Sequence, residues 1–570
     1  MKPFFAAALL LAALLLVAEH ACAAQGEQPL SMAEMESMWR AGKTLPESVF
    51  ERFKNNYGRA KIAHDTGINV LIDQAHNCKF ILMWRFPREL NQCGFRATVT
   101  YATLDTVLVP GKSRTRIHVG DAWPYVWFRH PKFNVVILYQ NDPTSPGYLP
   151  EERELLIQFV REGGGLIVLG TATRDEQTAK QWSLNKLLAV FGAAYGPQTD
   201  EDPDSATPRP ALRLDESWEV LRKGKRDAPI RARRTFGKGR VVIVEGYDVM
   251  YGGKEPEGRE QRIALLREIV SWAAQGMPPA GGEPLNYTIY PDQQVTIGPM
   301  TIYYTRNQLD EIIRAARQDA RDVYDQLFRW YPSPRATDPF VIIACNGGGG
   351  GWAVGGRPRT VGVICKDRLA FLSVLGHELA HTMGGPPNTK GELAGIPPIP
   401  NSGEAHAGWF QGKINALYRP ELRDKPNRDC NRVFVFDKTG CTFDISNVPP
   451  GENSKQWTKI WWIWQKLDDR YGPTWYTRWK WVQHMRWMDD PQHKLTWDEM
   501  VEDMCIAVGE DLFPFFKKIG TSKVTRDRLP QIEFLGETIT LPVAPLEPTP
   551  AGHVRIEEIG DYTKPLTPRD

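Results

Sequence analysis

The 570-residue sequence has no surplus of charge of either sign, because 70 Lys and Arg are balanced by 68 Asp and Glu. Without a basic surplus the chain lacks the electrostatic signature of nucleic-acid binding, so no nucleic-acid partner is expected. Beyond the N-terminus no apolar run is long enough to cross a bilayer, so no membrane span is predicted. Cysteine is scarce, with 8 residues and no Cys-x-x-Cys pair. The absence of such a pair argues against a cysteine-ligated zinc site.

The first 24 residues have the pattern of a cleavable export signal. Lys2 supplies a positive start, the stretch Phe4–Val17 is apolar, and Ala21–Ala23 forms a small-residue cleavage site. Cys22 could mark a lipid anchor, but the residues just before it, Glu and His, stand where a lipoprotein signal has small or aliphatic side chains. The protein is therefore expected to be secreted, periplasmic or on the cell surface.

Export permits disulfide bonds in the mature chain, which keeps seven cysteines. An odd number leaves at least one of them without a partner. The candidate bridges are Cys78 with Cys93, Cys430 with Cys441, and Cys345 with Cys365 on neighbouring predicted strands.

Residues 61–275, which follow an amphipathic helical lead-in at 25–60, alternate apolar strands with helices. A helix at Glu151–Arg161 leads through three glycines into one of the strands. This alternation predicts an α/β domain with a flavodoxin-like parallel sheet, covered by helices on both faces. The predicted strands are Ile68–Ile72, Ala97–Tyr101, Val135–Tyr139, Leu166–Leu169 and Val241–Val244.

Two stretches of this domain, Tyr148–Leu156 and Gly237–Val244, resemble the class I glutamine-amidotransferase-like superfamily. Catalytic members carry a cysteine on a sharp turn between a strand and a helix. The turn here, Gly170–Arg174, contains no cysteine, and neither Cys78 nor Cys93 follows such a strand. The resemblance therefore implies a domain that binds a ligand or acts as a spacer and does not catalyse a reaction.

A linker at 276–284, rich in Pro and Gly, separates this domain from a second one at 285–545. The last 25 residues, 546–570, form a Pro-rich tail. In the second domain the pattern predicts paired strands, a long helix, two strands around a glycine loop, and a further helix. The paired strands are Tyr287–Tyr290 and Met300–Tyr304, and the long helix is Gln308–Trp330. The strands Phe340–Ala344 and Thr360–Cys365 flank the glycine loop Gly347–Gly351, and the further helix is Leu369–Met383.

The last of these helices contains the sequence His377-Glu-Leu-Ala-His381. Histidines four residues apart lie on one face of a helix, one turn from each other, and can hold one metal ion. The acid between them, Glu378, can reach a water bound to that metal. The chemistry of such a site is hydrolysis assisted by zinc.

A hydrolytic zinc site needs a third protein ligand, and Glu392, Glu404 and His406 are within reach along the chain. Glu392 lies in a loop broken by Gly and Pro. Glu404 begins a helix-compatible run 23 residues after His381, so a second helix can return its carboxylate to the metal. His406, two residues further on, does not share that helical face and is interpreted as a residue that supports the ligands from behind or lies at the surface.

These residues carry a second resemblance. The pattern His377–His381 followed by Gly403 and Glu404 is similar to the M60 (enhancin-like) zinc metallopeptidases. The late run Gly509–Gly520 and the glycine-rich segment Gly347–Gly356 agree with that family, so the resemblance spans roughly 283–525. A departure is the Pro-rich loop between His381 and Glu404.

The resemblance implies an α+β zincin-like (gluzincin) domain in which His377, His381 and Glu404 hold Zn²⁺ and Glu378 acts as general base. A protein or glycoprotein is then the expected substrate, with glycan binding as an added feature. Two alternatives stay open. One is a secreted carbohydrate-binding protein whose zincin domain no longer hydrolyses a substrate, and the other is a gluzincin without glycan preference. Tyr418 and His484 are unranked candidates for a second donor to the oxyanion.

Tryptophan is abundant, with 19 residues, most of them in the last third of the chain. Trp457, Trp461 and Trp464 recur at helical spacing, which favours packing in a core. The alternative is that surplus rings line a sugar-binding cleft.

Overall fold

The computed structural model describes the chain in segments. They are 62, 64–76, 86–109, 116–118, 126–127, 132–205, 207–250, 258–281, 288–330, 340–347, 350–354, 359–382, 402–418, 443–449, 453–472, 475–476, 478–480, 482–483, 495–529, 531–534 and 537–539. Several predicted features lie outside these segments: the signal at 1–24, the lead-in at 25–60, the tail at 546–570, Cys22, Cys78, Glu392, Cys430, Cys441 and His484.

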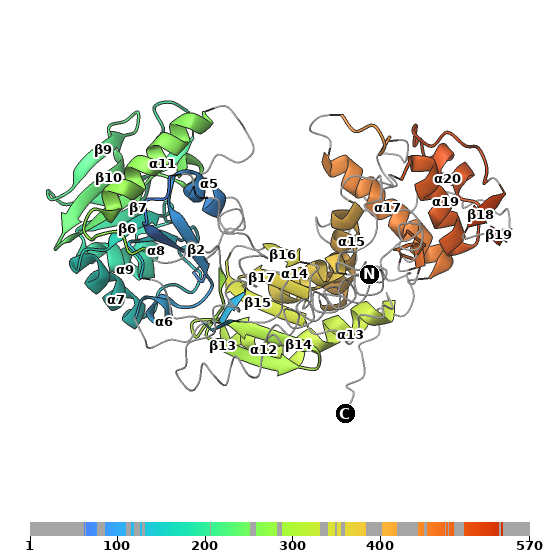
Figure 1. Cartoon of the computed structure of the whole chain (residues 1–570), viewed down its shortest axis with the longest axis horizontal. Helices are drawn as coiled ribbons and strands as arrows, with labels where there is room; N and C mark the ends of the chain where they lie inside the picture. The colour runs from blue at the N-terminus through green and yellow to red at the C-terminus, as the bar shows by residue number, and fades with distance from the viewer. Residues whose placement is uncertain are drawn as a thin grey trace, which may run out of the picture.

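The first half of the chain forms a ten-stranded sheet in the order β4-β3-β12-β2-β1-β5-β6-β11-β10-β9 (Figure 1). The six central strands, from β12 to β11, run parallel. All five strands predicted for this region are present, and the region is mixed α/β. The strands are β1 Asn69–Asp73, β2 Arg96–Thr100, β3 Arg116–His118, β4 Val126–Trp127, β5 Val135–Tyr139, β6 Gly165–Leu169, β9 Glu219–Lys223, β10 Pro229–Phe236, β11 Gly239–Val244 and β12 Thr288–Ile289, with β7 Ala193–Glu201 and β8 Pro208–Leu214 in a separate ribbon.

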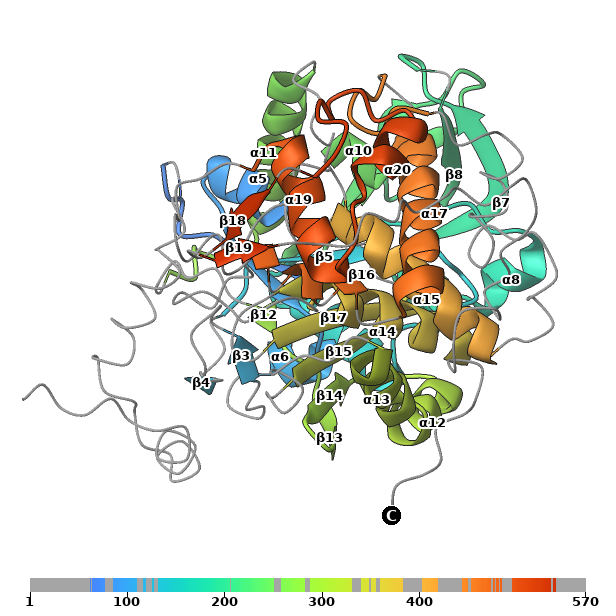
Figure 2. The same cartoon turned by 90° about the vertical axis from the view of Figure 1, so that its right-hand side faces the viewer.

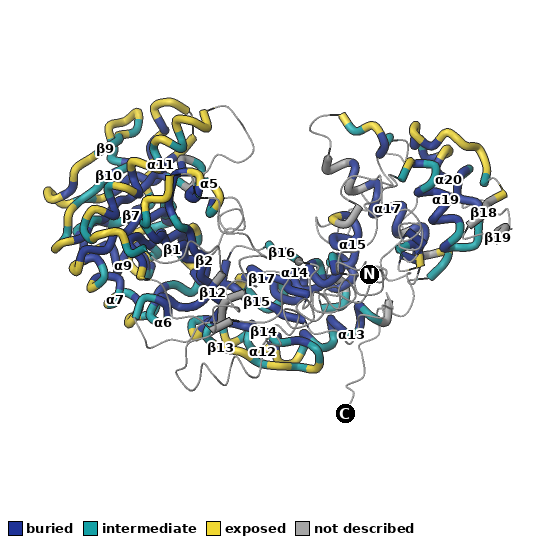
Figure 3. The backbone as a smooth tube through the Cα atoms, viewed as in Figure 1, coloured by how far each residue is buried: buried dark blue, intermediate teal, exposed yellow. Residues whose placement is uncertain are grey.

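Helices cover both faces of this sheet, as the continuous apolar strands predict. Every residue of β1, β5 and β6 is buried (Figure 3). Val70 and Ile72 pack with α5 and α11, whereas Leu71, between them, packs with α6, α7 and α9 on the other face. The helices are α5 Phe86–Gln92, α6 Leu104–Leu108, α7 Pro150–Arg161, α8 Glu176–Gln181, α9 Ser183–Val190, α10 Tyr247–Met250 and α11 Arg259–Ala274.

One strand pairing predicted from the sequence is wrong. The segments 287–290 and 300–304 do not pair with each other: β12 joins β2 and β3 in the first sheet, although it follows the linker in sequence. The strand at Met300–Tyr304, β14, pairs with its neighbours in a second sheet. An apolar run predicts a buried strand, but its partner depends on which sheet has a free edge nearby.

The second sheet has five strands in the order β13-β14-β15-β17-β16. β14, β15 and β17 are parallel, and β16 is an antiparallel edge strand beside β17. Helices α12, α13 and α14 pack on one face of this sheet. The other face contacts the domain of the first sheet, where the rings of Tyr101 and Trp352 lie 6.5 Å apart. The elements are β13 Gln293–Ile297, β14 Met300–Tyr304, α12 Asp310–Gln318, α13 Ala320–Trp330, β15 Phe340–Asn346, β16 Gly350–Val354, β17 Arg359–Cys365 and α14 Arg368–His381.

Two local predictions for this region differ from the structure. The single long helix expected at 308–330 is divided at Asp319 into α12 and α13. The glycine loop is shorter than expected, because Gly350 and Gly351 begin the edge strand β16. Glycine has low strand propensity, but here hydrogen bonds with the neighbouring strand β17 outweigh that preference.

The predicted bridge between Cys345 and Cys365 is also wrong, because the two buried cysteines are not joined by a disulfide. The register pairs Cys345 with Ile364 and Cys365 with Asn346. A shift of one residue places the two thiols on opposite faces of the sheet, and they belong to different apolar clusters. Neighbouring strands were predicted correctly, but the register prevents the bond.

The described residues from 402 onward are mainly helical, and in the view of Figure 2 their helices lie in front of the second sheet. Trp461, Trp464, Trp475 and Trp479 are buried in the apolar cluster that also contains α14, which confirms the core interpretation for them. No described helix is long and apolar enough to span a membrane. The elements are α15 Ser402–Tyr418, α17 Asn453–Tyr471, α19 Trp497–Val508, α20 Phe513–Lys518, β18 Ile532–Phe534 and β19 Glu537–Ile539.

A fully buried ionic cluster lies at the carboxyl end of β1 in the first sheet. His76 Nδ1 is 3.0 Å from Asp73 Oδ2, and His76 Nε2 is 3.0 Å from Glu152 Oε2 on α7. The Tyr148 hydroxyl donates to Asp73 at 3.0 Å, and two backbone N–H groups donate to Glu152. Burial by itself would lower the pKa of His76, but the two carboxylates outweigh it and raise the pKa to about 10. The cluster thus holds an imidazolium between two carboxylates.

Candidate metal centre

Helix α14, which carries the His-Glu-x-x-His sequence, is anchored at both ends. At its start the side chain of Asp367 accepts from the backbone N–H of Ala370 at 2.7 Å, a typical N-cap. At its end the hydroxyl of Thr382 donates to the carbonyl of Leu379 at 2.6 Å. The buried guanidinium of Arg359, at the start of β17, donates to the Thr382 carbonyl at 3.4 Å. These contacts fix the last turn, where the two histidines stand.

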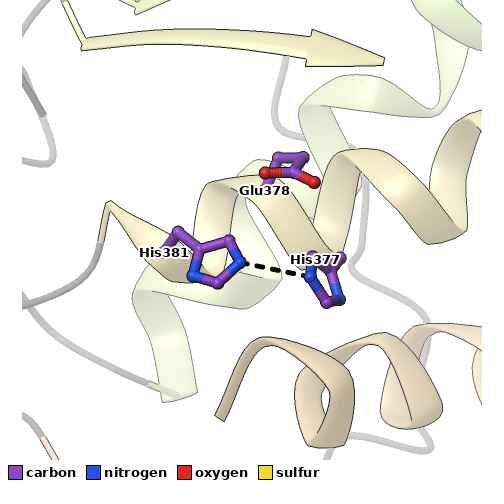
Figure 4. A group of neighbouring side chains, drawn as sticks. All are labelled: His377, Glu378 and His381. Carbon is purple, nitrogen blue, oxygen red and sulfur yellow. Dashed lines mark hydrogen bonds between the residues drawn. The ribbon is translucent and has the colours of Figure 1, made fainter. Parts of the chain in front are cut away.

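Two imidazoles and one carboxylate converge beside this turn. The Nε2 atoms of His377 and His381 are 3.1 Å apart, and Figure 4 shows the two rings on one side of α14. Glu404 lies in the first turn of α15, as the sequence predicts, and its Oε2 is 3.4 Å from His377 Nε2. Its Oε1 is 3.5 Å from His381 Nε2. Residues separated by the Pro-rich segment thus come together because α14 and α15 pack side by side.

The spacing of these three groups fits a small tetrahedral cation. Zinc bonds to nitrogen and oxygen of about 2.0–2.2 Å, in tetrahedral geometry, separate the ligand atoms by roughly 3.3–3.6 Å. The observed separations of 3.1, 3.4 and 3.5 Å lie close to this range. Two imidazoles and one carboxylate are also a donor set that zinc hydrolases use.

A second carboxylate, that of Glu378, also lies near the imidazoles, with an oxygen within 4.8 Å of a nitrogen of each ring. We assign the ligand position to Glu404 because its oxygens are closer, at 3.4 and 3.5 Å, and come from the facing helix. Figure 4 shows Glu378 pointing to a different side of α14 from the imidazoles. The two acids therefore occupy different positions around the same site.

Glu378 is packed against the edge strand β16. A Cβ atom added to Gly351 would lie 2.5 Å from Glu378 Oε1 and 2.6 Å from its Cγ, so this position has room only for glycine. The side chain of Glu378 is 4 % exposed, and burial raises its pKa to about 8. A carboxylate with a raised pKa accepts a proton readily near neutral pH.

The charges at the site are complementary. Hydrogen bonding to the two imidazoles lowers the pKa of Glu404 below its ordinary value. Burial would lower the pKa of His381, but Glu404 outweighs it and raises that pKa. The position of Glu404 in the first turn of α15 also suits an anion, because the N-terminus of a helix carries partial positive charge.

The structure also places two further candidates, His406 and Tyr418. His406 is buried, and its ring stacks on Tyr476 with centroids 3.5 Å apart, so its interpretation as a surface residue is wrong. Tyr418 ends α15 and lies 5.5 Å from the guanidinium of Arg368, at the start of α14. Because the histidines are at the other end of α14, Tyr418 cannot donate to a group bound there.

Sequence reasoning missed two residues beside the histidines. Gln411 Oε1 lies 3.2 Å from His377 Nδ1, and Gln411 Nε2 donates to the Ser373 hydroxyl at 2.9 Å. The available signal was spacing: Gln411 comes seven residues after Glu404, two turns along the same helical face. Ser373 precedes His377 by one turn on α14.

No protein-family model matches the chain, and no curated protein matches it. Among solved structures, an exo-beta-1,4-mannosidase from Opitutaceae bacterium strain TAV5 is similar, with 12 % identity and a TM-score of 0.23, over 37 % of this chain and 36 % of that one. The cytoplasmic protein STM1381 from Salmonella typhimurium LT2 is similar over 37 % of this chain and 99 % of that one, with 12 % identity and a TM-score of 0.22. The chain thus spans about a third of the mannosidase's length, and no residue role is carried over from either protein.

Proposed function

We propose that this protein is an exported zinc-dependent metallopeptidase, built from a zincin-like domain behind an amidotransferase-like domain. The observation that carries the proposal is the convergence of His377, His381 and Glu404 at 3.1–3.5 Å, with Glu378 beside them on the same helix. The His-Glu-x-x-His pattern and the facing-helix carboxylate are independent in sequence. Their meeting in space at metal-ligand spacing is not expected of solvated surface residues.

The residues divide the work of hydrolysis. The ion would be held by His377, His381 and Glu404. In that position zinc would lower the pKa of a water molecule and polarise the scissile carbonyl. Glu378 accepts a proton from the attacking water and then delivers it to the leaving amine. The raised pKa of Glu378, about 8, suits both transfers, because the same group must gain and lose a proton near neutral pH.

The edge strand β16 supports an extended peptide as substrate. Its pairing with β17 uses one side, and the sheet order places no described strand on the other. A free strand edge offers backbone N–H and carbonyl groups with which a peptide can pair. Because Gly351 brings this strand against Glu378, a peptide on β16 would lie close to the general base.

The preference for glycosylated proteins rests on the M60 resemblance. The described tryptophans do not add to it, because Trp461, Trp464, Trp475 and Trp479 are buried and offer no face to a sugar. We therefore propose peptide-bond hydrolysis as the activity and glycoproteins, such as mucins, as the substrate class.

The first domain is proposed to bind a ligand or to act as a spacer, and not to catalyse a reaction. The turn after β6 has no cysteine. Cys93, the described cysteine of this domain, follows helix α5, and burial raises its pKa to about 11. A thiol with so high a pKa is a poor nucleophile at neutral pH.

The function is tested by incubating the protein with a mucin and with the same mucin after deglycosylation, each with and without a chelator. The expected result is cleavage of the glycosylated form that the chelator stops and added zinc restores. Equal cleavage of both forms would point to a peptidase without glycan preference. Binding of mucin without cleavage under any condition would contradict the enzymatic proposal and favour a carbohydrate-binding protein.

Replacing Gly351 with Ala is expected to lower hydrolysis about 100-fold while zinc still binds. The added methyl group would come within 2.6 Å of the Glu378 side chain and of the Gly362 carbonyl, so the carboxylate or the strand must shift, and a displacement of about 1 Å costs that much in a catalytic group. Peptide cleavage and zinc content by elemental analysis measure the two effects.

The matched control is Gly376→Ala on α14. There the new methyl group would meet side-chain atoms of Ile414 and Phe410 at 3.0 and 3.1 Å, which need only a small adjustment. If the Gly351→Ala variant cleaves as fast as the parent, β16 does not hold Glu378 in place.

A further inference from the structure

Gln411 on α15 makes contacts to two residues of α14 that are one turn apart. Its Oε1 is 3.2 Å from His377 Nδ1, and its Nε2 donates to Ser373 Oγ at 2.9 Å. The amide therefore spans the gap between the helices next to the metal centre. Its own helix carries Glu404 two turns earlier, so one rigid element supplies both groups.

The contact determines which nitrogen of His377 is available to a metal. A neutral imidazole carries one N–H, and the other nitrogen keeps its lone pair. In His377 the Nε2 atom faces His381 and Glu404, whereas Nδ1 faces Gln411. If Nδ1–H donates to Gln411 Oε1, the lone pair is on Nε2 and points at the proposed ion.

We propose that Gln411 is a positioning residue that holds His377 in the tautomer and ring orientation required for zinc binding. The inference rests on the zinc site proposed above and adds a residue that acts through His377 without touching the metal. The amide end opposite the imidazole is held by Ser373, so the Oε1 atom stays directed at His377. Hydrogen-bonded partners of this kind orient metal-binding histidines and raise the basicity of the ligand nitrogen.

The test is zinc affinity, measured by competition with a chromophoric chelator on the full chain. Gln411→Met keeps the length of the side chain but removes both hydrogen bonds, and we expect zinc binding to weaken roughly 10- to 100-fold. Gln411→Glu keeps an acceptor for Nδ1–H, and the Ser373 hydroxyl can donate to it, so this variant should bind zinc at least as tightly as Gln411→Met and close to the parent. Gln318→Met, at an exposed position in α12, is the matched control and should leave affinity unchanged.

A second measurement separates positioning from stability. In the presence of chelator, the melting temperatures of the parent and of Gln411→Met should agree within a degree or two, while the rise caused by saturating zinc should be smaller in the variant. Equal zinc affinity in the parent and in Gln411→Met would overturn the inference about Gln411. A lower melting temperature of Gln411→Met in chelator, without a loss of affinity, would also overturn it.

The same data distinguish failure of this inference from failure of the proposed function. A parent chain that binds no zinc, or binds it equally after His377→Ala, contradicts the metal centre itself. A parent that binds one zinc through His377, with Gln411→Met unchanged, leaves the metallopeptidase proposal intact and removes only the role of Gln411.

Discussion

Replacing Glu378 with Gln is expected to lower peptide hydrolysis by roughly 10²–10⁴-fold, the usual contribution of a general base, while zinc remains bound. The amide has nearly the shape of the carboxylate, so it fits beneath Gly351, but it cannot accept a proton from water. The ligands His377, His381 and Glu404 are untouched. Cleavage assays and elemental analysis of the same preparation measure both properties.

His377→Ala provides the opposite pattern, since it should lose zinc and activity together. Glu260→Gln makes the same acid-to-amide change at an exposed position of α11, and it should leave both properties unchanged. If the Glu378→Gln protein hydrolyses peptides at the parental rate, Glu378 is not the general base. If it loses zinc as well as activity, Glu378 is a ligand, and Glu404 must be reassigned.

Replacing His76 with Leu is expected to destabilise the first domain by about 3–5 kcal/mol, the cost of removing one partner of a buried ion pair. His76 lies between Asp73 and Glu152, at 3.0 Å from each, and all three side chains are inaccessible to water. Without the imidazolium the two carboxylates face each other in a medium of low polarity. Urea unfolding of the full chain, followed by circular dichroism, measures the loss.

The stabilisation from His76 also depends on pH in a defined direction. Its pKa is about 10 in the folded chain and about 6.5 in an unfolded one. A group whose pKa is raised by folding stabilises the protein fully below the unfolded value and loses this effect as pH rises through the folded value. The stability difference between the parent and His76→Leu should therefore be largest near pH 6 and shrink toward pH 10.

His64→Asn is the matched control, because His64 is exposed and its backbone φ of 52° is one that Asn tolerates. A double variant, His76→Leu with Glu152→Gln, should recover part of the stability, because it removes one of the two unpaired charges. If His76→Leu unfolds at the parental urea concentration at pH 6, the imidazole is neutral in the folded chain and the cluster is not ionic.

Much of the architecture could be predicted from the residues themselves. The unbroken apolar runs at 135–139 and 165–169 form the fully buried centre of a parallel sheet, and the spacing of Trp461 and Trp464 corresponds to a buried helix face. Such features are local, because burial on both faces or on one helical stripe is written into successive residues. Which strand pairs with which, and in what register, is not encoded locally. For this reason the pattern predicts the wrong sheet for the segment at 288–289 and a bridge between Cys345 and Cys365 that does not form.

The features of the candidate metal centre also fall into two groups, those that follow from local sequence and those that depend on packing. The amino-acid pattern alone predicts that His377 and His381 share a helix face with Glu378 between them, because a four-residue spacing on a helix leaves little freedom. The packing of the folded chain is what brings Glu404 on α15 to 3.4–3.5 Å from the imidazoles, places Gly351 against Glu378, and puts Gln411 in contact with His377. These contacts join segments that are far apart in the sequence, and their distances depend on how helices and strands pack, which no local pattern encodes.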